Sequence, residues 1–434
     1  MWDASAHVTA WHIPVLGQHW RISISRAAMP WTISEFASQL RDFAARARPV
    51  WLGGQAGALA PTAEEDTTLA LCSALGFQSD PRAQGVPEAF CEAFAASPLP
   101  VGSPLLAGRE RELETLAACV SAWRAGDKTM LAVTGPAGCG LTSFLRQIET
   151  LAAAGERVCY HRLDVRPRDS AEALAIAASL FDITEPPADF DALRERALAC
   201  EPRILVLDGG HALASRIMGS AQAMRGLGAL MVATLERHLW VVGSHEQAWR
   251  RLIYLHQADR YFSHHIKLDY LDASGLEATI TARLERSGYS LAPGDTATPG
   301  ANDAALPRAL ADLQRLSQGK PDLAFFHLLR AATFTPGERE FSLGGWRKLD
   351  YSPLRQLDRD DYFTLAEIAA HGGLSAAEHQ AIFRARPEDT RLRLAHLGRL
   401  GLVECPPGNA GQYRLVPLFA DAIIAHLVNG NYLY

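Results

Sequence analysis

A glycine-rich segment in the first half of the chain has the spacing of a loop that binds phosphate. It reads Gly135-x-x-x-x-Gly140-Leu141-Thr142 and follows the apolar run 130–134. Glycines let backbone N–H groups turn towards a phosphate at the start of a helix, and the Thr142 hydroxyl suits Mg²⁺. Leu141 stands where this pattern has a lysine that reaches the β- and γ-phosphates. A turn that serves only chain geometry is the alternative. The positions expected to contact phosphate are Gly135, Gly138, Gly140, Thr142 and Ser143.

An aspartate at the end of a second apolar run supports phosphate binding. Asp208 follows the run 204–207, and its carboxylate would hold Mg²⁺ together with Thr142. The next residue, where a glutamate would orient water for hydrolysis, is Gly209. A charge-assisted hydrogen bond contributes about 1.5–3 kcal/mol, so the missing lysine weakens triphosphate binding roughly 10- to 150-fold. We therefore expect weak binding of ATP and Mg²⁺ and little or no hydrolysis.

Two more polar residues are candidates for a role at a γ-phosphate. Ser244 follows the apolar run 239–242 and would present its hydroxyl from a neighbouring strand, with a plain turn serine as the alternative. Arg260 would stabilise phosphate charge in an adjacent subunit, with an ordinary surface arginine as the alternative. The adjacent His264 and His265 would point to opposite faces of a strand, which argues against a shared metal ion.

The arrangement of apolar runs predicts the elements that position these residues. Runs near 130–134, 158–163, 204–207 and 239–242 alternate with helical segments, which is the order of a parallel sheet with crossover helices. The fold class expected is α/β, a P-loop nucleotide-binding sheet with a helical lid. The expected domains are a small mixed α/β domain of unknown role at 1–98, the core at 105–270, the lid at 271–350 and a winged helix at 351–434.

The last segment has the order helix, Gly-Gly, helix, helix and hairpin, which is typical of a winged helix. Its expected recognition helix carries Arg391, Arg393 and Arg399, and the expected wing carries Arg414. These arginines would contact DNA phosphates, although nearby acidic residues oppose this. A protein-packing or regulatory winged helix is the alternative.

Composition narrows the classes of protein. The 434 residues hold 42 Lys and Arg against 48 Asp and Glu, a formal charge of −6, so no global positive field attracts nucleic acid. No run approaches the roughly 18 apolar residues of a membrane span, and the first residues lack the pattern of a secretion signal. The seven cysteines include no C-x-x-C pair. We expect a cytoplasmic protein without structural zinc or disulfides. Five tryptophans before residue 98 would serve either core packing or a partner.

Across residues 105–434 the sequence resembles the AAA+ ATPases, particularly their origin-recognition and signal-transducing (STAND) branches. The resemblance follows the order of a Gly-Arg-Glu-Arg helix, the phosphate loop, the strand ending in Asp208, Arg-Tyr-Phe at 260–262, the lid and the winged helix. Segments 249–252, 287–289, 319–323 and 429–433 resemble a little-characterised set of bacterial AAA+ proteins. The resemblance implies nucleotide at 135–143, magnesium at Asp208, a sensor at Ser244 and a trans-acting arginine at Arg260.

Three functions stay open at this point, and with them the question of whether the chain is an enzyme. The first is a degenerate AAA+ scaffold or regulatory subunit in a homo- or hetero-oligomer, which lends Arg260 to an active ATPase neighbour. The second is a nucleotide-dependent switch or slow ATPase that uses Thr142 and Asp208. The third is a DNA-binding protein that uses its winged helix.

Overall fold

The computed structural model of the chain describes residues 9–15, 18–24, 68–164, 166–167, 169–213, 221–292, 305–406 and 411–433. The chain divides into two compact units, 1–65 and 66–434. In the first unit, β1 (Thr9–Val15) and β2 (Gln18–Ile24) form an antiparallel hairpin. Two of the early tryptophans, Trp11 and Trp20, lie on these strands, and Trp2, Trp31 and Trp51 lie outside the described residues.

A five-stranded, fully parallel sheet forms the centre of the second unit. Its order is β5-β6-β7-β4-β8. The residues of β4, β6 and β7 are almost all buried, as expected for strands covered on both faces. The strands are β4 (Met130–Gly135), β5 (Arg157–Arg162), β6 (Arg203–Asp208), β7 (Leu239–His245) and β8 (His264–Lys267).

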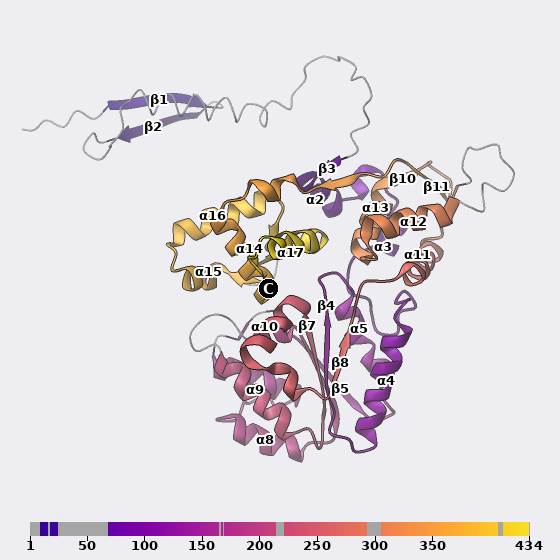
Figure 1. Ribbon diagram of the computed structural model, residues 1–434, viewed down its shortest axis with the longest axis vertical. Coiled ribbons are helices and arrows are strands. Elements are labelled where there is room, and N and C mark those ends of the chain that lie inside the picture. Colours follow the sequence, from indigo (N-terminus) through magenta and orange to yellow (C-terminus); the bar gives the residue numbers. More distant parts are fainter. Residues whose placement is uncertain are drawn as a thin grey trace, which may run out of the picture. The chain divides into compact units, whose positions relative to one another are not determined.

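Helices cover both faces of this sheet. Successive side chains of a strand point to opposite faces, and those of β4, β6 and β7 accordingly alternate between two apolar clusters. Leu131 and Val133 of β4 pack with the helices on one face, whereas Met130 packs with those on the other. Figure 1 shows α8, α9 and α10 on one side of the strands and α4 and α5 on the other. The predicted α/β class with a parallel P-loop sheet is confirmed. The helices are α4 (Glu110–Arg124), α5 (Leu141–Arg146), α6 (Ile148–Leu151), α7 (Ser170–Leu180), α8 (Phe190–Ala199), α9 (Ala221–Ala233) and α10 (Glu246–His256).

Three helices follow the sheet and are called the lid below: α11 (Ala273–Ser287), α12 (Ala305–Ser317) and α13 (Pro321–Ala331). A small sheet of order β10-β11-β9 accompanies them. Its strands are β9 (Ser290–Leu291), β10 (Ala332–Phe334) and β11 (Glu340–Leu343).

Residues 68–98 pack on this helical region. The segment contains β3 (Thr68–Ala70), α2 (Leu71–Ser79), a 3₁₀ turn η2 (Arg82–Gln84) and α3 (Glu88–Ala93). Strand β3 pairs in parallel with β12 (Lys348–Asp350). The Phe90 ring centroid lies 4.9 Å from that of Phe334 and 5.2 Å from that of Phe341. The aromatic side chains of 77–94 bury themselves against the lid, and apolar burial is the dominant stabilising term.

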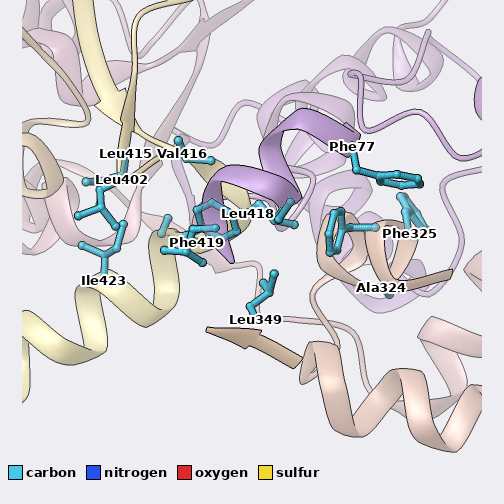
Figure 2. Close-up of a cluster of buried hydrophobic side chains, with 14 of the residues drawn as sticks. Phe77, Ala324, Phe325, Leu349, Leu402, Leu415, Val416, Leu418, Phe419 and Ile423 are labelled. Carbon is cyan, nitrogen blue, oxygen red and sulfur yellow. The ribbon is translucent and has the colours of Figure 1, made fainter. Parts of the chain in front are cut away.

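The C-terminal elements share the same apolar cluster. Figure 2 follows it from Phe77 and Phe325 past Leu349 to Phe419 and Ile423. The order of elements is helix, short strand, helix, helix and two strands, followed by a last helix. They are η6 (Ser352–Gln356), α14 (Arg359–His371), β13 (Leu374–Ser375), α15 (Ala376–Phe383), α16 (Pro387–Arg399), β14 (Val403–Glu404), β15 (Gln412–Leu415), η7 (Pro417–Phe419) and α17 (Ala420–Asn429). Among the described residues, none of the helices combines the length and apolar character that a bilayer crossing requires.

Candidate nucleotide site

The glycine-rich segment makes the tight turn between β4 and α5 that its sequence suggests. Gly138 and Gly140 have φ values of +81° and +90°, a backbone region that only glycine adopts without strain. A Cβ at Gly135 would lie 2.5 Å from the Cys139 Sγ, so this position also requires glycine. The turn opens directly into the first turn of α5, at Leu141. The backbone of an anion-binding loop is therefore present.

The two side chains expected to bind magnesium lie together. The Thr142 Oγ1 donates a hydrogen bond to the Asp208 Oδ2 at 2.8 Å. The hydroxyl of Tyr160, on the neighbouring strand β5, donates to the same oxygen at 2.7 Å. Burial and the adjacent Asp208 raise the pKa of Tyr160, which keeps the phenol a hydrogen-bond donor. Sequence analysis missed Tyr160, because nothing in its local sequence says that β5 and β6 are neighbours.

Leu141 and Ser143 serve the packing of α5. Leu141 is 7% exposed and belongs to the apolar cluster between α4, α5 and the sheet. The Ser143 Oγ accepts a hydrogen bond from the Leu99 N–H at 3.0 Å and so anchors the segment before the core. Neither side chain supplies the positive charge that a triphosphate requires.

The residues after Asp208 contain no carboxylate and little space for one. Gly209 has a φ of +91°, and a Cβ there would lie 3.0 Å from the Leu163 carbonyl oxygen. The next residues form a 3₁₀ turn, η3 (Gly210–Leu213), which contains His211. The ring centroids of His211 and His245 lie 4.6 Å apart, and burial lowers the pKa of both. The two imidazoles are therefore neutral at neutral pH, and neither adds a charge near Asp208.

Ser244 pairs with Thr134 on the strand that leads into the loop, whereas Arg260 lies on a separate turn. Ser244, near the end of β7, is fully buried, and its hydroxyl donates to the His245 carbonyl at 3.3 Å. Arg260 is exposed on a 3₁₀ turn, η4 (Ala258–Tyr261), and does not line the cavity beside the loop.

A cavity of about 1000 Å³ lies beside the loop and is bordered by the core, the lid and the C-terminal elements. The core contributes the loop, Asp208 and Arg166, the lid contributes Arg283 and Asp322, and α17 contributes Asp421. A Cβ at Gly138 would lie 2.5 Å from the Asp322 Oδ2, so this carboxyl group packs on the loop backbone. Burial raises the pKa of Asp322 to about 7. The loop glycines and the Thr142–Asp208 pair fit a magnesium nucleotide, whereas Leu141 and Asp322 oppose one.

Two core arginines join the core to the C-terminal elements. Arg166 forms an ion pair with Glu378 and donates to the His371 carbonyl at 3.1 Å. Its side chain is 5% exposed, so these bonds are shielded from solvent. Arg251 on α10 pairs with Glu367 on α14 at 3.4 Å. The C-terminal elements are thereby held against the edge of the cavity.

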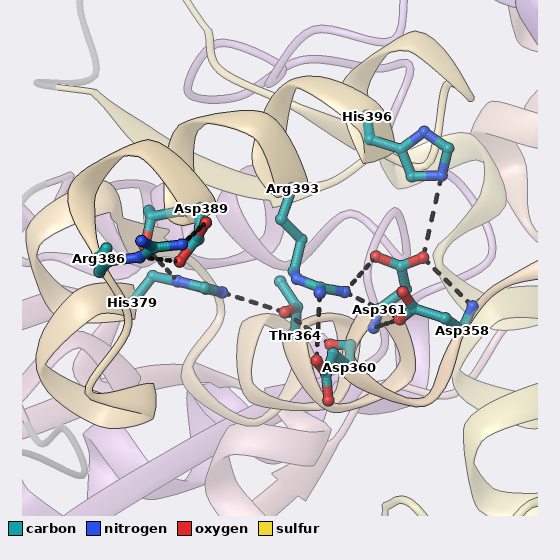
Figure 3. A network of polar contacts seen from close by, with 10 residues as sticks. Asp358, Asp360, Asp361, Thr364, His379, Arg386, Asp389, Arg393 and His396 are labelled. Carbon is teal, nitrogen blue, oxygen red and sulfur yellow. Dashed lines mark hydrogen bonds and ion pairs between the residues drawn. The ribbon is translucent and has the colours of Figure 1, made fainter. Parts of the chain in front are cut away.

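The arginines considered for DNA differ in their surroundings. Arg393 forms ion pairs with Asp358, Asp360 and Asp361 at the start of α14, at 2.9, 3.2 and 2.7 Å (Figure 3). Arg414 pairs with Glu404 at 2.8 Å. Arg391 and Arg399 are exposed on α16. Arg393 and Arg414 thus have carboxylate partners within the protein.

The sheet order, the glycine-rich turn after β4 and the Thr142–Asp208 pair define a P-loop ATPase-type fold. No protein-family model matches the sequence, and no curated protein does either.

Solved structures with this general architecture are similar to most of the chain. The ORC2 protein of Aeropyrum pernix, in ADPNP and ADP complexes, is 16% identical, with 80% of this chain and 97% of that chain covered and a TM-score of 0.37. Drosophila ORC bound to DNA is 15% identical, with 90% and 99% covered and a TM-score of 0.40. The Walker-type ATPase of Pyrococcus abyssi is 12% identical, with 76% and 99% covered and a TM-score of 0.40. These TM-scores are below 0.5 and do not indicate a function. The function must therefore be inferred from the residues of the site itself.

Proposed function

We propose that this chain is a degenerate AAA+-type subunit that acts as a scaffold or regulator, binds magnesium nucleotide weakly and does not turn it over. One observation carries the proposal: the Thr142–Asp208 pair is retained beside a loop whose lysine position is a packed leucine. When a magnesium nucleotide is bound, its Mg²⁺ would neutralise part of the negative charge of the phosphates. The backbone N–H groups of 138–143 would then hold its phosphates, and Thr142 and Asp208 would hold the ion.

The surroundings of Gly209 support the absence of turnover. A side chain at this position would require a left-handed backbone and would crowd Leu163. The neutral His211 and His245 cannot replace a carboxylate that holds water by charge, because burial disfavours their protonation. The proposed role is therefore structural, with nucleotide as an optional ligand.

Arg260 is the residue we propose to act in trans. It is exposed on η4, where its guanidinium is available to a second subunit. An arginine can stabilise phosphate charge across a subunit boundary. The partner would be an active ATPase subunit in a homo- or hetero-oligomer, and Ser244 would at most hold the strand end at β7.

We propose that residues 351–434 are a winged helix whose role is packing on the core. The order of its elements, from α14 to β15, supports the assignment, and the bonds of Arg166 and Arg251 support the packing role. The internal partners of Arg393 and Arg414 favour this role over DNA binding. In the same proposal the core spans 105–270, the lid spans 271–350, and residues 1–98 keep an unassigned role.

A nucleotide-dependent switch is the second candidate. The observation that favours it is the shared cavity, in which loop, lid and α17 residues face one space. A ligand there would contact all three and alter their packing.

The test is magnesium-ATP binding by calorimetry, with hydrolysis measured in parallel. We expect millimolar or weaker binding by the wild type, binding about 10- to 150-fold tighter by Leu141→Lys, and none by Asp208→Ala. Neither the wild type nor Gly209→Glu should hydrolyse ATP. Hydrolysis by the wild type that disappears in Asp208→Ala would contradict the proposal and favour the slow ATPase.

A further inference from the structure

We propose that Lys320, at the start of α13, supplies the phosphate-binding cation that position 141 lacks, and that Asp421 of α17 competes with phosphate for its amine. The inference rests on the proposed function in one respect, since it requires the loop to accept a phosphate chain. It adds a binding residue from the lid. It also makes two contacts mutually exclusive, since the Lys320 amine pairs either with a bound di- or triphosphate or with Asp421 of α17.

The first argument is the position of the lysine stem. A Cβ built at Gly138 would lie 2.8 Å from the Lys320 Cε, so the stem lies directly against the loop backbone. Only the last bond of the side chain, from Cε to Nζ, separates this contact from the amine. Rotation about the bond before it would redirect the amine without moving α13.

The second argument is where the amine points now. Its Nζ lies 2.8 Å from the Asp421 Oδ2 and also donates to the Pro417 carbonyl. Lys320 is 1% exposed, whereas the Asp421 side chain is 37% exposed. A buried ammonium requires an anionic partner, so it can leave Asp421 only for another anion. A phosphate in the loop is such an anion, and Asp421 regains water when it is released.

Neighbouring cations do not offer the same choice. Arg109 is 4% exposed, and its guanidinium donates to the carbonyls of Cys139 and Asp269 while pairing with Glu112. These bonds brace the loop from within the core. Arg146, in the last turn of α5, donates to the Leu99 carbonyl, on the segment before the core. Lys320 differs from these two arginines because its present partners, Asp421 and the Pro417 carbonyl, belong to the C-terminal elements.

Two further side chains connect the loop to this ion pair. The Tyr270 hydroxyl donates to the Ala137 carbonyl of the loop at 3.3 Å, and its ring centroid lies 6.0 Å from the Lys320 Nζ. The Asp322 carboxyl packs on Gly138 beside the lysine stem. A phosphate must therefore displace Asp421 from the Lys320 amine, and the nearby Asp322 carboxyl adds no favourable charge. This competition would make nucleotide binding weak.

The experiment measures magnesium-ADP binding by calorimetry on full-length variants. Asp421→Asn removes the competitor, and we expect binding at least about tenfold tighter than wild type. Adding Lys320→Met to this variant should weaken binding about 10- to 150-fold, and adding Leu141→Lys to that pair should restore it. Lys348→Met, an exposed lysine on β12, is the matched control and should change nothing.

Hydrogen exchange supplies a readout independent of affinity. In the wild type at saturating magnesium-ADP, amides of α17 should exchange faster than without ligand, because Asp421 has lost its partner. In Lys320→Met they should exchange equally with and without ligand. If Asp421→Asn does not bind at millimolar nucleotide, or if its gain persists with Lys320→Met, Lys320 is not the phosphate cation. Hydrolysis of ATP by the wild type would contradict the proposed function, but it would not change the result of this test of Lys320.

Discussion

At the scale of single residues, the unusual feature of the site is a carboxyl group facing an anion-binding loop. Asp322 is 9% exposed, and its Oδ1 accepts a hydrogen bond from the Leu323 N–H at 2.8 Å. Burial raises its pKa from an ordinary value near 4 to about 7. The folded protein therefore holds this proton over a pH range in which the unfolded chain has released it.

This difference gives the stability a definite pH dependence. The folded state binds the extra proton between about pH 4 and 7, so the free energy of unfolding decreases as pH rises through that window. Asp322→Asn removes the effect. We expect the variant to equal wild type near pH 4 and to exceed it by about 1–4 kcal/mol at pH 8, measured by urea unfolding. The exposed Asp259→Asn is the control, and equal pH slopes for Asp322→Asn and wild type would contradict the prediction.

Single residues also show how much of the site could be predicted from the sequence. Leu141, Gly209, Thr142 and Asp208 stand out because the loop pattern assigns each of them a place. Lys320 and Asp322 lie about 180 positions beyond the loop, and only the packing of α13 on Gly138 brings them there. No local pattern encodes such a contact.

At the scale of elements, Arg393 of α16 forms ion pairs with the start of α14. Arg393 faces three aspartates, of which Asp361 is 6% exposed and also closes the capping box at the start of α14. The helix that would read DNA is therefore tied by its central cation to its own domain. This was not evident from sequence, since Arg391, Arg393 and Arg399 look equivalent along the chain.

Replacing this arginine should destabilise the C-terminal elements. Arg393→Ala leaves three carboxylates without their shared cation, and we expect a loss of about 1–3 kcal/mol in urea unfolding. Arg391→Ala, on the exposed side of the same helix, should stay within about 0.5 kcal/mol of wild type. Equal stability of the two variants would show that the three ion pairs contribute little.

At the scale of the whole second unit, the sequence predicts the parallel sheet well and the packing of the surrounding segments poorly. Buried strands leave continuous apolar runs, so β4, β6 and β7 are recognisable from composition. Residues 68–98 carry no such mark. Their aromatic side chains contact the lid only in the folded structure, through residues that lie far away in the sequence.

The attachment of the C-terminal elements to the core can be tested through Arg166. Arg166→Ala removes the ion pair with Glu378 and the bond to the His371 carbonyl. We expect amides of α14 and α15 to exchange about 10- to 100-fold faster, with those of β4 and β6 unchanged. Arg194→Ala, which loses only an exposed pair with Asp191, is the control. Unchanged exchange in Arg166→Ala would mean that apolar packing alone holds these elements.

The pairing of β3 with β12 also has a consequence for biosynthesis. Thr68 pairs with Lys348, which is 280 positions later in the chain. At about 5–20 residues per second, the ribosome needs roughly 15 to 60 s to make the stretch between them. During that time Leu71, Phe77 and Phe90 lack part of the apolar surface that covers them in the finished protein. Strand β3 therefore has no partner strand until the parallel sheet and the lid, which lie between it and β12 in the sequence, have been synthesised.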